Sequence, residues 1–185
     1  MKRLALAVTL ALGACDRPPL PANETGTLDP LTFFLGMSEG HGRLHTVIGG
    51  SEPLRVRSVG TRDGDDALVL KQSIKQGGKP WRQRQWVMRR LGPGRFTGTL
   101  TDAASPVSVT VTGPRARIHY WMKGGFEVDQ QLALQSAESL CNRLVVRKFG
   151  IRVAWVNETI VRRPQLPTGG RADDPEPEPA ACPQA

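Results

Sequence analysis

The sequence predicts an all-β protein, built as an antiparallel up-and-down β-barrel of about eight to ten strands with little helix. Short segments with alternating apolar and polar residues recur at roughly ten-residue spacing, which is typical of half-buried strands. Turns rich in glycine separate these segments, and no long crossover lies between them, so successive segments are expected to pair as hairpins. A barrel is favoured over a sandwich because closing the sheet removes its exposed edges.

The first half of the expected barrel contains a plug and five strands. Residues 31–36 could form a short helix or turn that closes one end of the fold. The strands that follow end at turns with glycine or proline, and Asp63 with Gly64 gives a typical hairpin signal. These strands are expected at residues 44–48, 54–61, 67–76, 81–90 and 95–101.

The second half supplies the clearest period-two pattern in the chain. Val107, Val109 and Val111 alternate with serine and threonine, as in a strand with one buried face. The segment after Gly113 has Ala116, Ile118, Tyr120 and Met122 on one face. Strands are expected at residues 107–112, 115–122, 126–134, 140–149 and 151–161.

The chain begins with the pattern of a secretory signal peptide, residues 1–14. Lys2 and Arg3 precede an apolar run that is too short to cross about 30 Å of hydrocarbon as a helix. Gly13 and Ala14 then precede Cys15, an order that resembles the lipobox of bacterial lipoproteins. The resemblance implies cleavage after Ala14 and lipidation of Cys15, so the mature protein would be anchored in a membrane of the bacterial cell envelope, facing the periplasm.

Two alternatives stay open for this leader. It could be an ordinary signal peptide followed by an incidental cysteine. If the anchor forms, Asp16 resembles the residue that keeps enteric lipoproteins in the inner membrane, but the rule varies among bacteria, so the inner and outer membranes are both possible.

The barrel is expected over residues 31–163, between two irregular segments. Residues 15–30 are rich in proline and predict a tether. Residues 164–185 combine proline with acidic side chains and predict a disordered, solvated tail, because such a segment cannot bury enough apolar area to fold.

Positive charge is concentrated on the body of the chain. Between Cys15 and Arg163 there are 22 lysines and arginines and 13 acids, a net charge of +9. A basic body anchored at a bilayer could lie against anionic head groups, although scattered arginines are also typical of a solvated surface. Binding to nucleic acid is not expected, because the chain carries an export signal and no basic patch interleaved with aromatic residues.

If Cys15 is acylated, two cysteines remain. Cys141 lies in an apolar segment, so a buried free thiol is expected there. A disulfide to Cys182 is the alternative, because the envelope permits disulfides. The spacing of the three cysteines matches no metal motif.

The chain contains Arg84 two residues before Trp86, and Asn142 and Arg143 followed by Lys148, Phe149 and Gly150. Together these short motifs resemble a bacterial lipoprotein family of unknown function, domain of unknown function 3833. The resemblance covers residues 34–161 and implies a lipocalin-like barrel without an established activity. The chain departs from the family pattern at Gln72, where the family has an acid, at Ile74, where it has an aromatic, and at Gly78 and Lys79, where it has an Asp-Gly turn. The matching residues are Phe34, Gly36, Gly40, Gly42, Arg84, Trp86, Phe96, Gly98, Asp102, Tyr120, Asp129, Asn142, Arg143, Lys148, Phe149 and Gly150.

Arg84 and Trp86 are the leading candidates for a binding site. They are two residues apart on an expected strand and therefore share a face. In one interpretation Arg84 stacks on Trp86 and seals the barrel. In the other, an inward Arg84 holds the carboxylate or phosphate of an acyl ligand. Tyr120 and Trp121 are further candidates, but they point to opposite faces, so at most one of them can line a cavity.

The residues from Asn142 to Gly150 are expected to have structural roles. Asn142 would fix a turn or bulge through backbone hydrogen bonds, and Gly150 would allow a bulge or sharp bend. Phe149 would contact the core, while Lys148 would be solvated or extended along the surface. Arg143 belongs to the same motif.

The sequence shows no convincing catalytic, cofactor or metal constellation, so an enzyme is not expected. His41 and His45 are four residues apart in a glycine-rich stretch, a spacing that aligns them for a metal only on a helix. Asp63, Asp65 and Asp66 are best interpreted as a hairpin turn.

The leading functional hypothesis is a membrane-anchored lipoprotein that binds or carries a lipid or other apolar ligand in its barrel. The first alternative is a structural or protein-interaction lipoprotein whose barrel is filled by its own side chains. An enzyme acting on acyl groups is the last alternative, because no nucleophile–base pair is evident.

Overall fold

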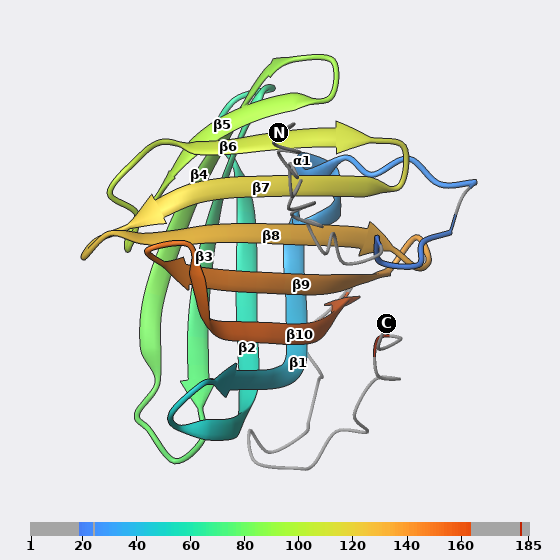
Figure 1. Ribbon diagram of the computed structural model, residues 1–185. Coiled ribbons are helices and arrows are strands. Elements are labelled where there is room, and N and C mark those ends of the chain that lie inside the picture. The colour runs from blue at the N-terminus through green and yellow to red at the C-terminus, as the bar shows by residue number, and fades with distance from the viewer. Residues whose placement is uncertain (1–18, 24, 164–181, 183–185) are drawn as a thin grey trace, which may run out of the picture.

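The computed structural model describes residues 19–23, 25–163 and 182, which form one closed antiparallel barrel. Each strand pairs with its neighbours in sequence, and the last strand pairs with the first. The predicted all-β, up-and-down barrel is therefore confirmed (Figure 1). The elements are α1 (Pro30–Phe33), β1 (Gly36–Thr46), β2 (Gly50–Arg62), β3 (Ala67–Gln76), β4 (Arg82–Gly92), β5 (Arg95–Leu100), β6 (Val107–Thr112), β7 (Arg115–Met122), β8 (Phe126–Leu134), β9 (Ser139–Lys148) and β10 (Ile151–Arg163).

Strand alternation divides the residues between the inside and the outside of the barrel. In Figure 1, β7–β10 cross in front of β1–β4, so the two walls face each other across the interior. Even-numbered positions on β3 and β4 point inward, because the buried positions alternate along these strands. Even-numbered positions on β9 and β10 also line the core and the cavity, among them Leu140, Asn142 and Glu158. The interior is mainly apolar, with Leu68, Trp86, Met88, Ile118, Val128, Leu132 and Leu140 among its buried side chains.

The first strand is much longer than predicted. It begins at Gly36, whereas the sequence pattern indicated a start near residue 44. The difference lies at Gly40 and Gly42, where strand β1 approaches β10 closely. A Cβ atom at Gly42 would lie 2.2 Å from the backbone oxygen of Asn157, so only glycine fits here. These glycines belong to the strand rather than to a loop.

Helix α1 plugs one end of the barrel, as expected for residues 31–36. The carboxylate of Asp29 accepts a hydrogen bond from the backbone N–H of Leu31 at 2.9 Å, which caps the helix start. Leu31 and Phe33 are buried in the core. We call the turns beside α1 the closed end, and the turns β1–β2, β3–β4, β5–β6, β7–β8 and β9–β10 the rim.

The segment predicted as a tether is packed against the barrel in part. Leu20 and Leu28 are buried, and the backbone N–H of Asn23 donates to the carbonyl of Leu134 at 2.7 Å. The two leucines explain the difference, since their burial on the barrel stabilises an otherwise proline-rich stretch. Residues 1–18, with Ala14, Cys15 and Asp16, lie outside the described part. Within the described ranges, no helix is long and apolar enough to cross a membrane.

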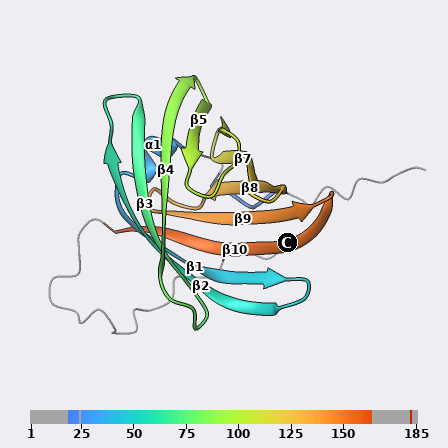
Figure 2. The same ribbon diagram turned by 90° about the vertical axis from the view of Figure 1, so that its left-hand side faces the viewer.

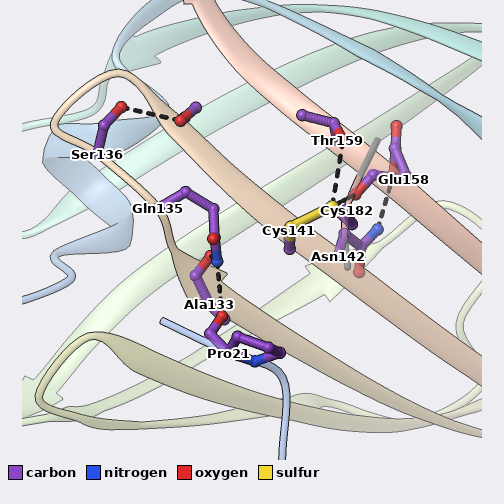
Figure 3. Close-up of a disulfide and its surroundings, with 10 residues drawn as sticks. Pro21, Ala133, Gln135, Ser136, Cys141, Asn142, Glu158, Thr159 and Cys182 are labelled. Carbon is purple, nitrogen blue, oxygen red and sulfur yellow. Dashed lines mark hydrogen bonds between the residues drawn. A yellow bond between two sulfur atoms is a disulfide. The ribbon is translucent and has the colours of Figure 1, made fainter. Parts of the chain in front are cut away.

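Cys141 forms a disulfide with Cys182, so the prediction of a free thiol is wrong (Figure 3). Because Asn142 points into the barrel, Cys141 points out of it, where the C-terminal segment can reach it. The Cα atoms of the two cysteines are 5.6 Å apart. Leu20 and Cys182 both belong to the outer cluster around Cys141. The rest of the predicted tail, residues 164–181 and 183–185, lies outside the described residues.

Candidate functional site

A cavity lies inside the barrel, above the apolar floor that α1 and the closed-end side chains provide. About 50 Å³ of it is open to water-sized groups, which is room for roughly three to five of them at about 10–15 Å³ each. Most of its wall is apolar, and its polar side chains come from strands β3, β4, β8, β9 and β10. The lining residues are Phe34, Val56, Leu68, Leu70, Gln72, Arg84, Trp86, Met88, Ile118, Gln130, Leu132, Asn142, Glu158 and Ile160.

Arg84 is held in the cavity wall by the side chain of Gln72. Its Nε and Nη2 atoms donate to the Oε1 atom of Gln72 at 3.0 and 2.8 Å, and Trp86 Nε1 donates to the same oxygen at 2.8 Å. Gln72 Nε2 in turn donates to the hydroxyl of Ser58 at 3.1 Å. A guanidinium has five N–H donors, so most of the donors of Arg84 are available to another group.

The positive charge of Arg84 is not neutralised by direct contact. In the described part of the chain, no carboxylate oxygen lies within 4.0 Å of its guanidinium, and its partner Gln72 is neutral. Burial lowers the pKa of Arg84 from its ordinary value. An anion that entered the cavity would offset this desolvation, because a charged hydrogen bond is stronger where water is excluded.

Glu158 is a second buried charge in the cavity wall. Its Oε2 atom accepts a hydrogen bond from Asn142 Nδ2 at 2.7 Å (Figure 3). Burial raises the pKa of the Glu158 carboxyl, while the Asn142 hydrogen bond and the charge of Arg84 act in the opposite direction. Gly40 makes room for this side chain, since a Cβ atom there would lie 1.8 Å from Glu158 Oε1.

Three buried oxygens of the cavity residues have no hydrogen-bond partner in the described part of the protein. They are Oε1 of Gln130, Oδ1 of Asn142 and Oε1 of Glu158. Buried acceptors are normally satisfied by protein, water or ligand. The cavity therefore offers donors from Arg84, acceptors from three other side chains, and apolar walls between them.

The structure brings Arg84 and Trp86 together, and both interpretations of this pair describe part of the arrangement. The Cζ atom of Arg84 lies 5.5 Å from the centroid of the Trp86 ring, a cation–π contact. Both side chains also line the cavity. Tyr120 is buried behind Trp86, with an edge-to-face ring contact at 5.8 Å, and is not a lining residue. Trp121 is exposed on the outer face, so its candidacy as a cavity residue is wrong.

The predicted roles at residues 142–150 are corrected in two places. Asn142 hydrogen-bonds Glu158 inside the barrel rather than fixing a turn. Phe149 is exposed rather than in the core, because it occupies the tip of a two-residue turn with Gly150. Gly150 has a φ angle of +76° in the β9–β10 turn, and Lys148 lies over the Phe126 ring. Arg143 is buried on the outward side of β9.

Sequence reasoning missed Glu158, Gln130 and the central role of Gln72. A signal for Glu158 was present, because it alternates with Val156 and Ile160 on the apolar face of its strand. A carboxylate in such a row indicates a buried charge. The nearby glycine that accommodates it lies on the first strand, far away in sequence.

The histidines lie outside the cavity. His41 and His45 are on β1, and His45 stacks on Trp155 with ring centroids 5.0 Å apart. His119 could join Glu127 and Asp129 around a cation, since their ligand atoms lie within 4.8 Å of one another. Asp129, however, already pairs with Arg147 and with His119, at 3.1 Å for the latter.

Comparison with solved structures supports the barrel fold. An S-type phycobiliprotein lyase from Guillardia theta matches with a TM-score of 0.59 at 8% identity, covering 74% of this chain and 92% of that protein. Rv2717c from M. tuberculosis matches with a TM-score of 0.54 at 14% identity, covering 74% and 99%. At these identities the likeness concerns the fold alone.

No curated protein sequence matches this chain significantly. The family model described as a protein of unknown function, DUF3833, matches residues 9–162, which is most of the chain. The motifs noted above, from Phe34 to Gly150, fall within this match. The chain therefore belongs to the DUF3833 family, whose fold is a lipocalin-like barrel.

Proposed function

We propose that this protein binds a small amphiphile in its barrel, with the apolar part against the floor and an anionic head at Arg84. The observation that carries the proposal is a guanidinium that lines a mainly apolar cavity, has unused donors and contacts no carboxylate within the described ranges. A carboxylate or phosphate accepts two parallel N–H donors from arginine, which makes it a suitable head group.

The shape of the cavity limits the apolar part of the ligand. Leu68, Leu70 and Met88 lie toward α1 on the floor, and Gln72 and Arg84 lie one step nearer the rim. A ligand that follows this order places its chain inward and its head toward the rim. The available volume suits a short acyl chain of a few carbons, or the end of a longer one.

We also propose that the protein works in the bacterial envelope, anchored through Cys15. The lipobox-like order of Gly13, Ala14 and Cys15 supports the anchor. The disulfide between Cys141 and Cys182 supports an oxidising compartment, since disulfides are rare in proteins of the cytosol. Intact-mass measurement of protein extracted from membranes tests the anchor. Unmodified Cys15 behind a retained leader would contradict it.

Ligand binding is tested by calorimetric titration of the full chain with octanoate, octyl phosphate and octanol. Octanoate or octyl phosphate is expected to bind more tightly than octanol. Arg84→Gln should weaken anion binding by roughly tenfold to a hundredfold, because charged hydrogen bonds contribute about 1.5–3 kcal/mol. Arg82→Gln is the matched control, since Arg82 is on the same strand but exposed and paired with Asp102 at 2.8 Å.

Gln72→Glu provides a second variant that keeps the arginine. A carboxylate at this position would neutralise Arg84 in place, so anion binding should fall while octanol binding is retained. Equal binding by the Arg84→Gln and Arg82→Gln variants would contradict the proposal. If none of the three compounds binds, the alternative of a barrel filled by its own side chains is favoured.

A further inference from the structure

Two neighbouring turns on the rim expose large apolar side chains to solvent. The β1–β2 turn carries Val47, 65% exposed, and Ile48, 100% exposed. The β9–β10 turn carries Phe149, 90% exposed, and is followed directly by Ile151, 70% exposed. The backbone N–H of Val47 donates to the carbonyl of Val153 at 3.0 Å, so the turns lie side by side. Figure 2 shows both projecting to the same side, away from α1. We call residues 46–51 and 148–152 the rim tips.

The conformation of Phe149 adds a second observation. Its φ angle is +51°, in the left-handed region that asparagine and glycine adopt most readily, and Gly150 follows at +76°. An aromatic residue in this conformation is strained, and an exposed phenyl ring gains nothing from the core. Asparagine at this position would adopt the same backbone conformation with less strain. The presence of phenylalanine therefore indicates that the ring contacts something outside the protein.

The charged residues of the rim tips, Lys148 and Arg152, are both cationic. Residues 43–51 and 147–155 contain Arg43, Arg147, Lys148 and Arg152 and no acidic residue. Two acids lie on adjoining strand positions, Glu52 opposite Leu44 and Glu127 opposite Arg147. Asp129, further from the rim, pairs with Arg147. Lys148 Nζ lies 5.0 Å from the Phe149 ring centroid, so a cation and an exposed ring are combined in one turn.

We propose that the rim tips insert into the surface of an anionic lipid bilayer. The apolar tips would enter the boundary between head groups and acyl chains, while Lys148, Arg152 and Arg43 remain at the level of anionic head groups. Two protruding turns with a cationic base match a soft, negatively charged surface better than the shaped pocket of a protein partner. Insertion would also bring the rim of the barrel to the membrane.

This contact is distinct from the proposed anchor. Leu20 packs on the outer face of β8 and β9 near the closed end, so a lipid at Cys15 would by itself hold that region near the membrane. The rim tips are at the opposite end of β9. If both contacts form, the barrel lies with its β9 flank along the bilayer.

The test places a fluorescent reporter at each end of the barrel. The full chain is reconstituted in vesicles whose acyl chains carry bromine, made from either phosphatidylglycerol or phosphatidylcholine. Ile48→Trp reports on the rim tips. Leu91→Trp is the matched control, because Leu91 is 63% exposed near the last residue of β4, at the closed end. Both variants add the same indole to the same native background.

In phosphatidylglycerol vesicles, bromine should quench the indole at position 48 at least twofold more than the indole at position 91. The excess should decrease in phosphatidylcholine and in the double variant Lys148→Gln with Arg152→Gln. Circular dichroism confirms that each variant is folded, and Val47→Trp replaces Ile48→Trp if that variant is not. Equal quenching at both ends, or no quenching at position 48, would overturn the inference. If the rim tips instead contact a protein partner or a second copy of the chain, no quenching at position 48 is expected.

Discussion

Replacing Glu158 by glutamine should stabilise the barrel at neutral pH. The wild-type carboxylate is buried, receives one hydrogen bond from Asn142, and leaves its Oε1 atom without a partner in the described structure. A glutamine keeps an oxygen for Asn142 and removes the buried charge. Desolvation of an incompletely paired group costs more for a charge than for a neutral amide, so the free energy of unfolding should rise by roughly 1–3 kcal/mol.

The stability difference between the wild type and Glu158→Gln should depend on pH. Burial raises the pKa of Glu158 in the folded protein above the ordinary value of 4.5. As the pH rises from 4.5 through the raised pKa, the unfolded chain loses its proton first, so the folded state binds more protons and its stability falls. Below that window both states are protonated. The advantage of Glu158→Gln should therefore be small in acid and grow toward neutral pH.

Urea unfolding from pH 4 to pH 8 measures both effects. Glu138→Gln is the control, since Glu138 is exposed and its substitution should change stability by less than about 0.5 kcal/mol. The reasoning is refuted if Glu158→Gln lowers stability at neutral pH. It is also refuted if the difference between wild type and variant does not change with pH.

Two further predictions concern close packing and the disulfide. Gly40→Ala should fold but lose about 1–3 kcal/mol, because its Cβ atom would displace the flexible carboxylate of Glu158 from its hydrogen bond. Gly98→Ala should cost more, since its Cβ atom would lie 2.0 Å from the backbone oxygen of Val87; equal melting temperatures for the two variants would contradict this ranking. Cys182→Ser removes a disulfide with a sequence separation of 41 residues and should lower stability by up to about 4 kcal/mol, as should reduction of the wild type. If neither treatment shifts the melting temperature, the disulfide does not stabilise the barrel.

Most of the strands could be predicted because each carries its own evidence in the sequence. Strands β3, β6, β7 and β8 have the predicted bounds, and all but β8 end at a turn that contains glycine. Strand β1 was predicted too short. Its Gly40 and Gly42 look like loop residues, and their reason lies in the approach of β10, which no local pattern records.

The candidate site could be predicted only where its residues lie on one strand. Arg84 and Trp86 share a face by simple alternation, so their proximity follows from the sequence. Glu158 reaches the same cavity only after the barrel closes and fixes the register of β10 against β1. The cavity itself depends on how side chains from several strands fill the interior, and period-two alternation contains no information about volume.

The local rules also failed where a residue contacts something outside its own strand. Phe149 was expected in the core because it is aromatic, but a two-residue turn at the rim has no core to enter. Cys141 was expected to be a free thiol because Cys182 lies in a segment with no strand or helix pattern. The exposure of Phe149 depends on where the β9–β10 hairpin turns, and the disulfide of Cys141 depends on a contact across 41 residues of sequence.

The seam between β1 and β10 makes the order of strands cyclic. It runs from Met37 opposite Arg163 to Thr46 opposite Ala154 and has the same antiparallel form as the hairpins around it. Every other strand pair joins strands that are adjacent in sequence, so its hydrogen bonds can form soon after the turn between them. The β1–β10 pair can form only when both the first and the last strand are present. A circular permutant that begins at any of the nine hairpin turns should therefore form the same closed barrel. A different pair of strands would then be the one that pairs last.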